Sequence, residues 1–134
     1  MRKTMNDIVI IFKALADDTR LRVLKLLSRG ELCVCEIATA LGLEQPRLSF
    51  HLRILKEAGI VVDRRQERWI LYHLNDADMF VRFLLLSIEE RMPPRQALLD
   101  WERLIAFGGR EKICLQKRQR EKRRENGKGL KRKH

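Results

Sequence analysis

The sequence predicts a mainly α-helical fold with one small β-hairpin, and two observations lead to this prediction. Between residues 5 and 58, and again between residues 77 and 107, apolar residues recur at the three- and four-residue spacing of amphipathic helices. Between residues 60 and 74 the spacing changes, and two segments rich in β-branched and aromatic residues flank a short polar stretch, as the strands of a hairpin do. A chain of 134 residues suits one domain, or one small domain with a tail.

Two helices are expected near the N-terminus, over residues 5–16 and 19–28. Asp17 offers a side-chain oxygen that can cap the start of the second helix, and Gly30 suits its end. Each helix has one apolar face, which predicts that both pack on a shared core. These faces consist of Ile8, Ile11, Phe12, Leu15, Leu21, Val23, Leu24 and Leu27.

Two shorter helices are expected next, over residues 35–41 and 45–58, with a tight turn at Gly42 between them. Pro46 is tolerated in the first turn of the second of these helices, and Gly59 suits its end. The pair therefore has the form helix, turn, helix. Its expected core positions are Ile37, Ala38, Leu41, Leu48, Leu52 and Leu55.

A β-hairpin is expected directly after this pair of helices. Its strands are residues 60–65 and 69–74, and Gln66-Glu67-Arg68 forms its polar tip. Residues 31–35, which precede the pair of short helices, are expected to be a connector.

Two further helices are expected over residues 77–91 and 95–107, the first of them capped by Asn75 or Asp76. The helix over 77–91 is apolar around a broad part of its surface. Because a chain this short buries only a thin core of its own, that surface favours dimerisation.

Positive charge is concentrated at the C-terminal end of the chain. Residues 110–134 contain 12 Lys and Arg against 3 Glu, whereas residues 1–109 contain 17 Lys and Arg against 15 Asp and Glu. We therefore divide the chain into a domain over residues 1–107 and a basic, flexible tail over 108–134, with frayed helix or disorder beyond Leu115. Such a tail attracts polyanions without reading their sequence, or it only keeps the protein in solution.

The two short helices and the hairpin together predict a winged helix-turn-helix, a fold that binds double-stranded DNA. In a helix-turn-helix the second helix lies in the major groove, where Gln can pair with adenine and Arg with guanine. Arginines on the hairpin suit contacts with phosphates or with the minor groove. The predicted DNA-contacting residues are Gln45, Arg47, Ser49, Phe50, His51 and Arg53 on the helix, and Arg64, Arg65 and Arg68 on the hairpin.

Sequence patterns over roughly residues 10–75 match those of a known family. The matching segments are Phe12–Ala16, Thr19–Leu27, Glu31–Ile37, Gln45-Pro46, Ser49–Gly59, Asp63-Arg64-Arg65, Arg68-Trp69 and Tyr72. In combination they resemble the ArsR/SmtB family of metal-responsive repressors. The resemblance implies a homodimer, formed through the terminal helices, that binds a palindromic operator and leaves it when a ligand binds.

The segment Glu31–Ile37 resembles the arsenic-sensing signature of this family, which implies As(III) or Sb(III) as the inducer. The signature has three cysteines. Cys33 and Cys35 match the first two, but Ala38 stands at the third position. Soft thiolates select soft ions, so Cys33 and Cys35 are the expected ligands. Cys114 is a candidate third ligand, and a small-molecule thiol is another.

Geometry sets a condition on this cysteine pair. Positions i and i+2 of a regular helix point about 200° apart, so Cys33 and Cys35 can hold one ion only where the backbone is not helical. A ligand bound there would distort the helix that supports the DNA-reading helix, and it would therefore favour the DNA-free form. The simpler interpretation is that both cysteines are small core residues.

The sequence also excludes several classes of protein and site. It has no Gly-rich phosphate loop and no nucleophile elbow, so it is not expected to be an enzyme, and no cofactor is required. Residues 77–107 lack histidine, so we expect no zinc site of the type that the family has on its C-terminal helix. No stretch approaches the ~20 apolar residues of a membrane helix, and no signal-peptide pattern is present, so the cytoplasm is expected.

Three alternatives stay open at this point. The protein could be a repressor switched by thiol oxidation, with Cys33 or Cys35 oxidised against Cys114, or a repressor without an inducer. Alternatively, the basic tail could make it an RNA-associated protein whose winged helix contacts other proteins.

Overall fold

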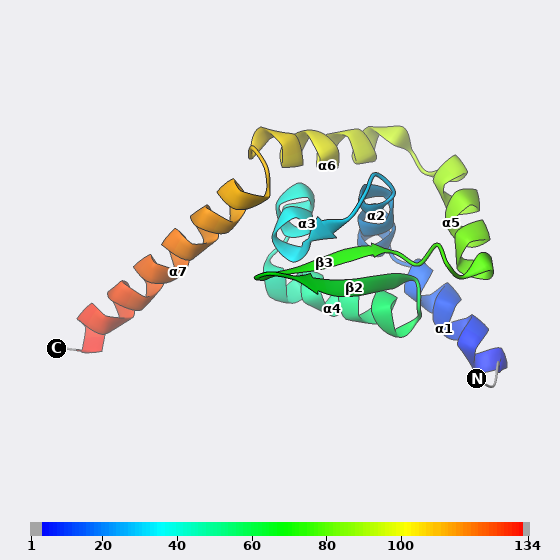
Figure 1. Ribbon diagram of the computed structural model, residues 1–134, viewed down its shortest axis with the longest axis horizontal. Helices are drawn as coiled ribbons and strands as arrows, with labels where there is room; N and C mark the ends of the chain where they lie inside the picture. The colour runs from blue at the N-terminus through cyan, green and yellow to red at the C-terminus, as the bar shows by residue number, and fades with distance from the viewer. Residues whose placement is uncertain (1–3, 133–134) are drawn as a thin grey trace.

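The computed structural model describes residues 4–132, except for the side chains of residues 111, 114–117 and 129–132. Its helices and strands confirm the predicted mainly α-helical fold (Figure 1). In chain order they are α1 (Met5–Leu15), α2 (Asp18–Leu27), β1 (Leu32–Cys33), α3 (Val34–Leu41), α4 (Gln45–Glu57), β2 (Val61–Gln66), β3 (Trp69–Leu74), α5 (Met79–Arg91), α6 (Pro94–Ala106) and α7 (Arg110–Arg132).

The sheet has one strand more than the hairpin that the sequence predicts. The expected connector contains the short strand β1, which pairs antiparallel with β3, where Leu32 lies opposite Tyr72. The strand order is therefore β1-β3-β2. A two-residue strand carries too little alternation to be seen in the sequence, because its pairing is decided by β3, which lies far along the chain.

Side-chain caps determine where the first helices begin. Thr4 and Asp7 form a capping box at the start of α1, and Asp17 accepts a hydrogen bond of 3.1 Å from the backbone N–H of Arg20 at the start of α2. The predicted cap of α5 was wrong. Asp78 caps this helix in place of Asn75 or Asp76, because the helix begins two residues later than expected.

The core lies where α3, α4 and the sheet meet. α3 ends at Gly42, whose φ of +67° is a left-handed conformation that glycine adopts without steric cost, and α4 begins three residues later. This confirms the predicted helix-turn-helix. The most deeply buried large side chains include Val23, Ile37, Leu48, Leu52, Leu55, Ile60 and Leu71.

An ion pair that joins α6 to α2 was not predicted from the sequence. Arg22 donates two hydrogen bonds, of 2.7 and 3.0 Å, to the carboxylate of Asp100, which is only 1% exposed. Gln96 donates a third hydrogen bond, of 3.0 Å, to the same carboxylate. Because its hydrogen bonds satisfy a buried charge, this cluster holds α6 across α2 and α3.

The C-terminal segment forms the helix α7, where the sequence led us to expect frayed helix or disorder. Its first turn packs on the domain, since Ile113 is buried and Arg110 pairs with Glu36 of α3. Beyond that turn, α7 projects away from the rest of the molecule (Figure 1). Because the sequence alone does not reveal this docked turn, a division at residue 107 separates Ile113 from the core it belongs to.

Two helices at the opposite end of the molecule expose apolar side chains. Phe12 of α1 is 53% exposed and Phe83 of α5 is 63% exposed. Exposed apolar neighbours on these two helices are Met5, Ile8, Val9, Ile10, Met79, Phe80 and Leu86. None of the helices in the described residues is both long enough and apolar enough to cross a membrane.

Candidate nucleic-acid interface and cysteine site

The outer face of α4 carries most of the side chains predicted to read DNA. Arg47, Ser49, Phe50 and Arg53 are exposed, and Gln45 is partly exposed at the first position of the helix. The guanidinium of Arg53 lies 5.8 Å from the centre of the Phe50 ring. Leu48, Leu52 and Leu55 are buried behind this face, so the helix has one side for the core and one for a partner.

His51 does not belong to this exposed face, which corrects the sequence-based assignment. It is 7% exposed, and its Nδ1 lies 3.2 Å from Nη1 of Arg20 and 3.9 Å from the carboxylate of Asp17. Burial lowers the pKa of His51, so the ring is neutral near pH 7. The spacing of α4 placed His51 at the edge of its apolar face, but only the neighbouring helix α2 decides that the ring is covered.

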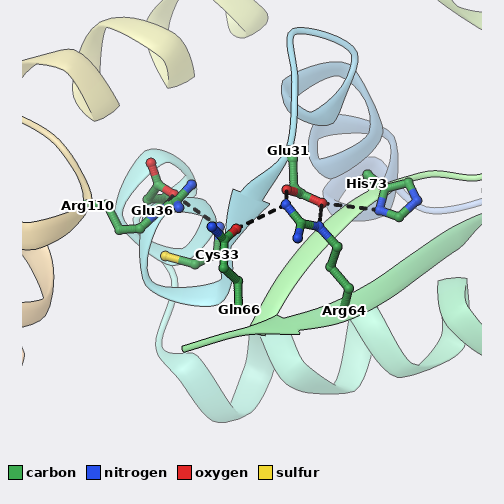
Figure 2. Close-up of polar contacts among 7 residues, drawn as sticks. All are labelled: Glu31, Cys33, Glu36, Arg64, Gln66, His73 and Arg110. Carbon is green, nitrogen blue, oxygen red and sulfur yellow. Dashed lines mark hydrogen bonds and ion pairs between the residues drawn. The ribbon is translucent and has the colours of Figure 1, made fainter. Parts of the chain in front are cut away.

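All three predicted arginines of the hairpin are exposed, but one of them is held in an ion pair. Arg65 and Arg68 are exposed, and the guanidinium of Arg68 lies 4.7 Å from the centre of the Trp69 ring. Arg64 instead forms a two-point ion pair with Glu31, with one N–O distance of 2.7 Å (Figure 2). A phosphate would have to compete with that carboxylate for Arg64.

The tip and base of the hairpin follow from local contacts. The loop has two residues, and the first of them, Glu67, has a φ of +55°. His73 of β3 lies 3.4 Å from the Glu31 carboxylate, on the same side of the sheet as Arg64 (Figure 2).

Cys33 and Cys35 lie at the junction of β1 and α3, where the backbone changes from strand to helix. Cys33 is the N-cap of α3, with φ −83° and ψ 163°, whereas Cys35 lies in the first helical turn. Because Cys33 has an extended backbone, the 200° separation that a regular helix would impose on the two side chains does not apply. The thiol of Cys33 is hydrogen-bonded to that of Cys35 and is 2% exposed, and both factors raise its pKa.

Cys35 also contacts the DNA-reading helix. Its Sγ accepts a hydrogen bond of 3.9 Å from Nε2 of Gln45, the first residue of α4. One side chain therefore joins the cysteine pair to the start of the exposed face. The sequence indicates both residues as site candidates, but nothing in the sequence pairs them, because the turn at Gly42 brings them together.

Glu36 organises the same junction from inside the protein. One carboxylate oxygen, Oε1, accepts a hydrogen bond of 3.1 Å from the backbone N–H of Cys33 and another of 2.8 Å from Nε of Arg110 (Figure 2). Glu36 is 7% exposed, so the arginine of α7 compensates a largely buried charge. Sequence reasoning missed both partners.

Cys114 is the candidate third ligand, and its side chain is not among those that the structure describes. Its backbone belongs to α7, directly after the buried Ile113 and one turn beyond Arg110. Among the side chains that the structure does describe, no group of three His, Cys, Asp or Glu residues is arranged to hold a metal ion.

Comparison with known proteins identifies the family. Residues 17–62 match the family model described as "Bacterial regulatory protein, arsR family". The chain is 57% identical over 67 residues to the arsenic resistance transcriptional regulator ArsR1 of Pseudomonas putida. The aligned residues make up 49% of this chain and 52% of that protein. It is 52% identical over 66 residues to the arsenical resistance operon repressor of Escherichia coli. These residues make up 48% of this chain and 56% of that protein. The chain thus spans about half the length of these two relatives.

A solved structure extends the comparison to the fold. The homodimeric winged helix-turn-helix DNA-binding domain Mb0332 of Mycobacterium bovis, a possible ArsR-family regulator, superposes with a TM-score of 0.59 at 32% identity, covering 64% of this chain and 78% of that one. The matched proteins are transcriptional regulators, which are not enzymes, as predicted. The chain therefore belongs to the ArsR/SmtB family of winged helix-turn-helix transcriptional regulators.

Proposed function

We propose that the protein is a homodimeric repressor that binds double-stranded operator DNA and is released by As(III) or Sb(III) held by Cys33 and Cys35. The observation that carries the proposal is the position of these thiols, which pack together at a non-helical junction and contact the first residue of the DNA-reading helix. Two relatives, an arsenic resistance regulator and an arsenical resistance operon repressor, support the choice of ligand.

The dimer is proposed to form through α1 and α5. Both helices carry exposed phenylalanines together with other apolar side chains, an arrangement that a monomer would leave in water at a free-energy cost of about 25 cal/mol per Å². The M. bovis neighbour is described as homodimeric, which favours the same assembly here. Two copies would present two α4 helices to a palindromic site.

We assign the recognition of base sequence to α4 and sequence-independent contacts with phosphates to the hairpin. Replacing Arg47 by alanine is expected to relax the preference for one base, at a cost of about 1–3 kcal/mol on the preferred sequence and little on others. Replacing Arg68 by alanine is expected to weaken binding to all duplexes by a similar factor, because phosphates carry no sequence. Fluorescence anisotropy with matched and single-mismatch duplexes checks both variants. Equal losses for Arg47→Ala on every duplex would contradict the base-reading role.

The raised pKa of Cys33 favours arsenite over a bare divalent cation. At neutral pH arsenite is the uncharged acid As(OH)₃. Each As–S bond forms as one As–OH bond breaks, and the thiol proton leaves with the hydroxide as water. A divalent cation has no such proton acceptor and must bind thiolates, which burial of Cys33 disfavours. Two cysteines supply two of the three sulfurs, and Cys114 or a small-molecule thiol supplies the third.

Release from DNA is proposed to pass through Gln45. An arsenic atom on Cys35 replaces the thiol proton and occupies space beside the sulfur that now accepts the Gln45 hydrogen bond, so it displaces the Gln45 amide. The first residue of α4 then loses its partner in α3, and the start of the reading helix changes orientation. The ligand binds this state better than the DNA-bound state, which is what linkage between two sites requires.

Titration of the DNA complex with a panel of ligands tests the proposal. The reduced protein, shown to be dimeric by sedimentation, is bound to a duplex that it selects from a random-sequence pool. As(III) and Sb(III) are expected to release this duplex at lower concentration than Cd(II), Pb(II), Zn(II) or peroxide. Release by peroxide with arsenite inert would establish the thiol-oxidation alternative, and retention with every ligand would establish a repressor without an inducer.

A further inference from the structure

We propose that α7 is a second DNA-binding element, which holds the phosphate backbone flanking each operator half-site, beyond the tip of the β2–β3 hairpin. The proposal rests on the proposed function, because it assumes that α4 and the hairpin lie on DNA. The partner of the basic C-terminal segment is therefore duplex DNA, and the segment binds it outside each half-site.

The first observation is the charge on the free part of the helix. Between residues 118 and 128 every side chain is exposed, and six of these residues are Lys or Arg while two are Glu. Arg120, Arg123 and Arg124 are spaced three and four apart, so they share one face of α7. Glu121 and Glu125, four apart, share another face. Three of the six cations therefore form a stripe on a face without Glu, whereas Arg118 and Lys122 lie on the same face as the two Glu.

The second observation is the anchor at the start of the helix. Arg110 donates to the Glu36 carboxylate and also lies 5.6 Å from the centre of the Trp69 ring. Trp69 pairs with Gln66, so it closes the two-residue loop at the hairpin tip. Ile113 is 5% exposed and adds an apolar contact. An ion pair, a ring contact and a buried side chain thus fix the first turn of α7 beside the part of the molecule expected to touch the DNA backbone.

The third observation is the direction and length of the helix. α7 slopes away from its joint with α6 toward the side of the molecule that carries α4, and its free end lies beyond the hairpin tip (Figure 1). Its 23 residues make it about 34 Å long, which equals about one turn of B-form DNA. A helix of that length, placed outside the hairpin, spans the backbone of the next helical turn.

These observations favour duplex DNA over the other roles of a basic tail. A segment that only keeps the protein in solution needs neither an anchored first turn nor a cationic stripe. An RNA-binding segment has no need to begin at the hairpin tip. A cationic helix anchored beside a DNA-reading unit can follow the regular spacing of duplex phosphates.

The test compares two duplexes and three proteins. One duplex is the core sequence that the wild-type dimer selects and protects, and the other has about ten additional base pairs, one helical turn, on each side. The variant Arg120→Gln/Arg123→Gln/Arg124→Gln removes the stripe and preserves helix propensity. The matched control, Arg120→Lys/Arg123→Lys/Arg124→Lys, keeps the charge. The measured quantity is the slope of the logarithm of the binding constant against the logarithm of KCl concentration.

On the long duplex the Gln variant is expected to lose about 3–5 units of slope per dimer, since each lost phosphate contact contributes ~0.9. On the core duplex it is expected to match the wild type, and the Lys control should match the wild type on both. The proposal would be overturned if the Gln variant kept the wild-type slope on the long duplex, or if it lost the same slope on both duplexes. It would also be overturned if the wild type bound an RNA helix of the same length more tightly than the long DNA duplex. Failure of the wild type to select any duplex would instead refute the proposed function.

Discussion

Replacing Cys33 by serine is expected to raise the arsenite concentration that releases half of the bound DNA by at least about 100-fold. Losing an outer hydrogen-bond partner of a ligand already costs ~10–100-fold in metal affinity, and this change removes a ligand itself. Serine offers a hard oxygen where the ion selects sulfur. DNA affinity without arsenite should stay within a factor of two or three of wild type, because Cys33 is buried away from the exposed face of α4. Anisotropy titration of the DNA complex with arsenite measures both quantities.

A serine at position 114 completes this experiment. If Cys114 is the third ligand, Cys114→Ser is expected to show a loss comparable to that of Cys33→Ser when no other thiol is present, and added glutathione should restore part of the response. If an external thiol is the third ligand, Cys114→Ser should behave as wild type. A Cys33→Ser protein that leaves DNA at wild-type arsenite levels would end the sensing proposal.

Replacing Arg22 by methionine is expected to lower the free energy of unfolding by about 3–5 kcal/mol, the second large effect. The carboxylate of Asp100, which is 1% exposed in the wild type, would keep only Gln96 among the hydrogen-bond donors described above. That loss is a large part of the ~5–15 kcal/mol that stabilises a typical domain. Urea unfolding at a fixed protein concentration measures it, since dimerisation makes stability depend on concentration.

Two controls separate the buried charge from lost packing. Arg95 lies exposed on α6, the helix that carries Asp100, and Arg95→Met is expected to change stability by less than about 0.5 kcal/mol. The double variant Arg22→Met/Asp100→Leu removes both charges and should recover most of the loss, because an apolar pair of similar volume is often as stable as a buried ion pair. A double variant as unstable as Arg22→Met would show that the ion pair is not the cause.

Local patterns in the sequence account for much of the fold and for the outline of the site. The apolar spacing of α4 predicted Leu48, Leu52 and Leu55 as core residues, and they are buried. Gly42 predicted the turn of the helix-turn-helix, since its left-handed backbone is a property of the residue itself. Features of this kind depend on neighbours within a few positions, so the chain alone reveals them.

Features that depend on distant partners were not predictable. Arg64 looked available for DNA until β1 brought Glu31 beside it, and His51 looked exposed until Arg20 covered it. Likewise Asp100, which resembles an ordinary surface residue of an amphipathic helix, is buried by Arg22, 78 positions away. Sequence spacing gives the face of each helix, but it does not give the identity of what lies against that face.

The shared oxygen of Glu36 has a consequence for how the protein would dissociate from DNA. Because Cys33 and Arg110 both donate to Oε1, any ligand that unwinds the start of α3 would also move the first turn of α7. Sequence-specific binding, which depends on Gln45, would then weaken together with the electrostatic binding of α7 to phosphates. An induced dimer would leave DNA entirely, and would not slide from its operator onto the surrounding sequence.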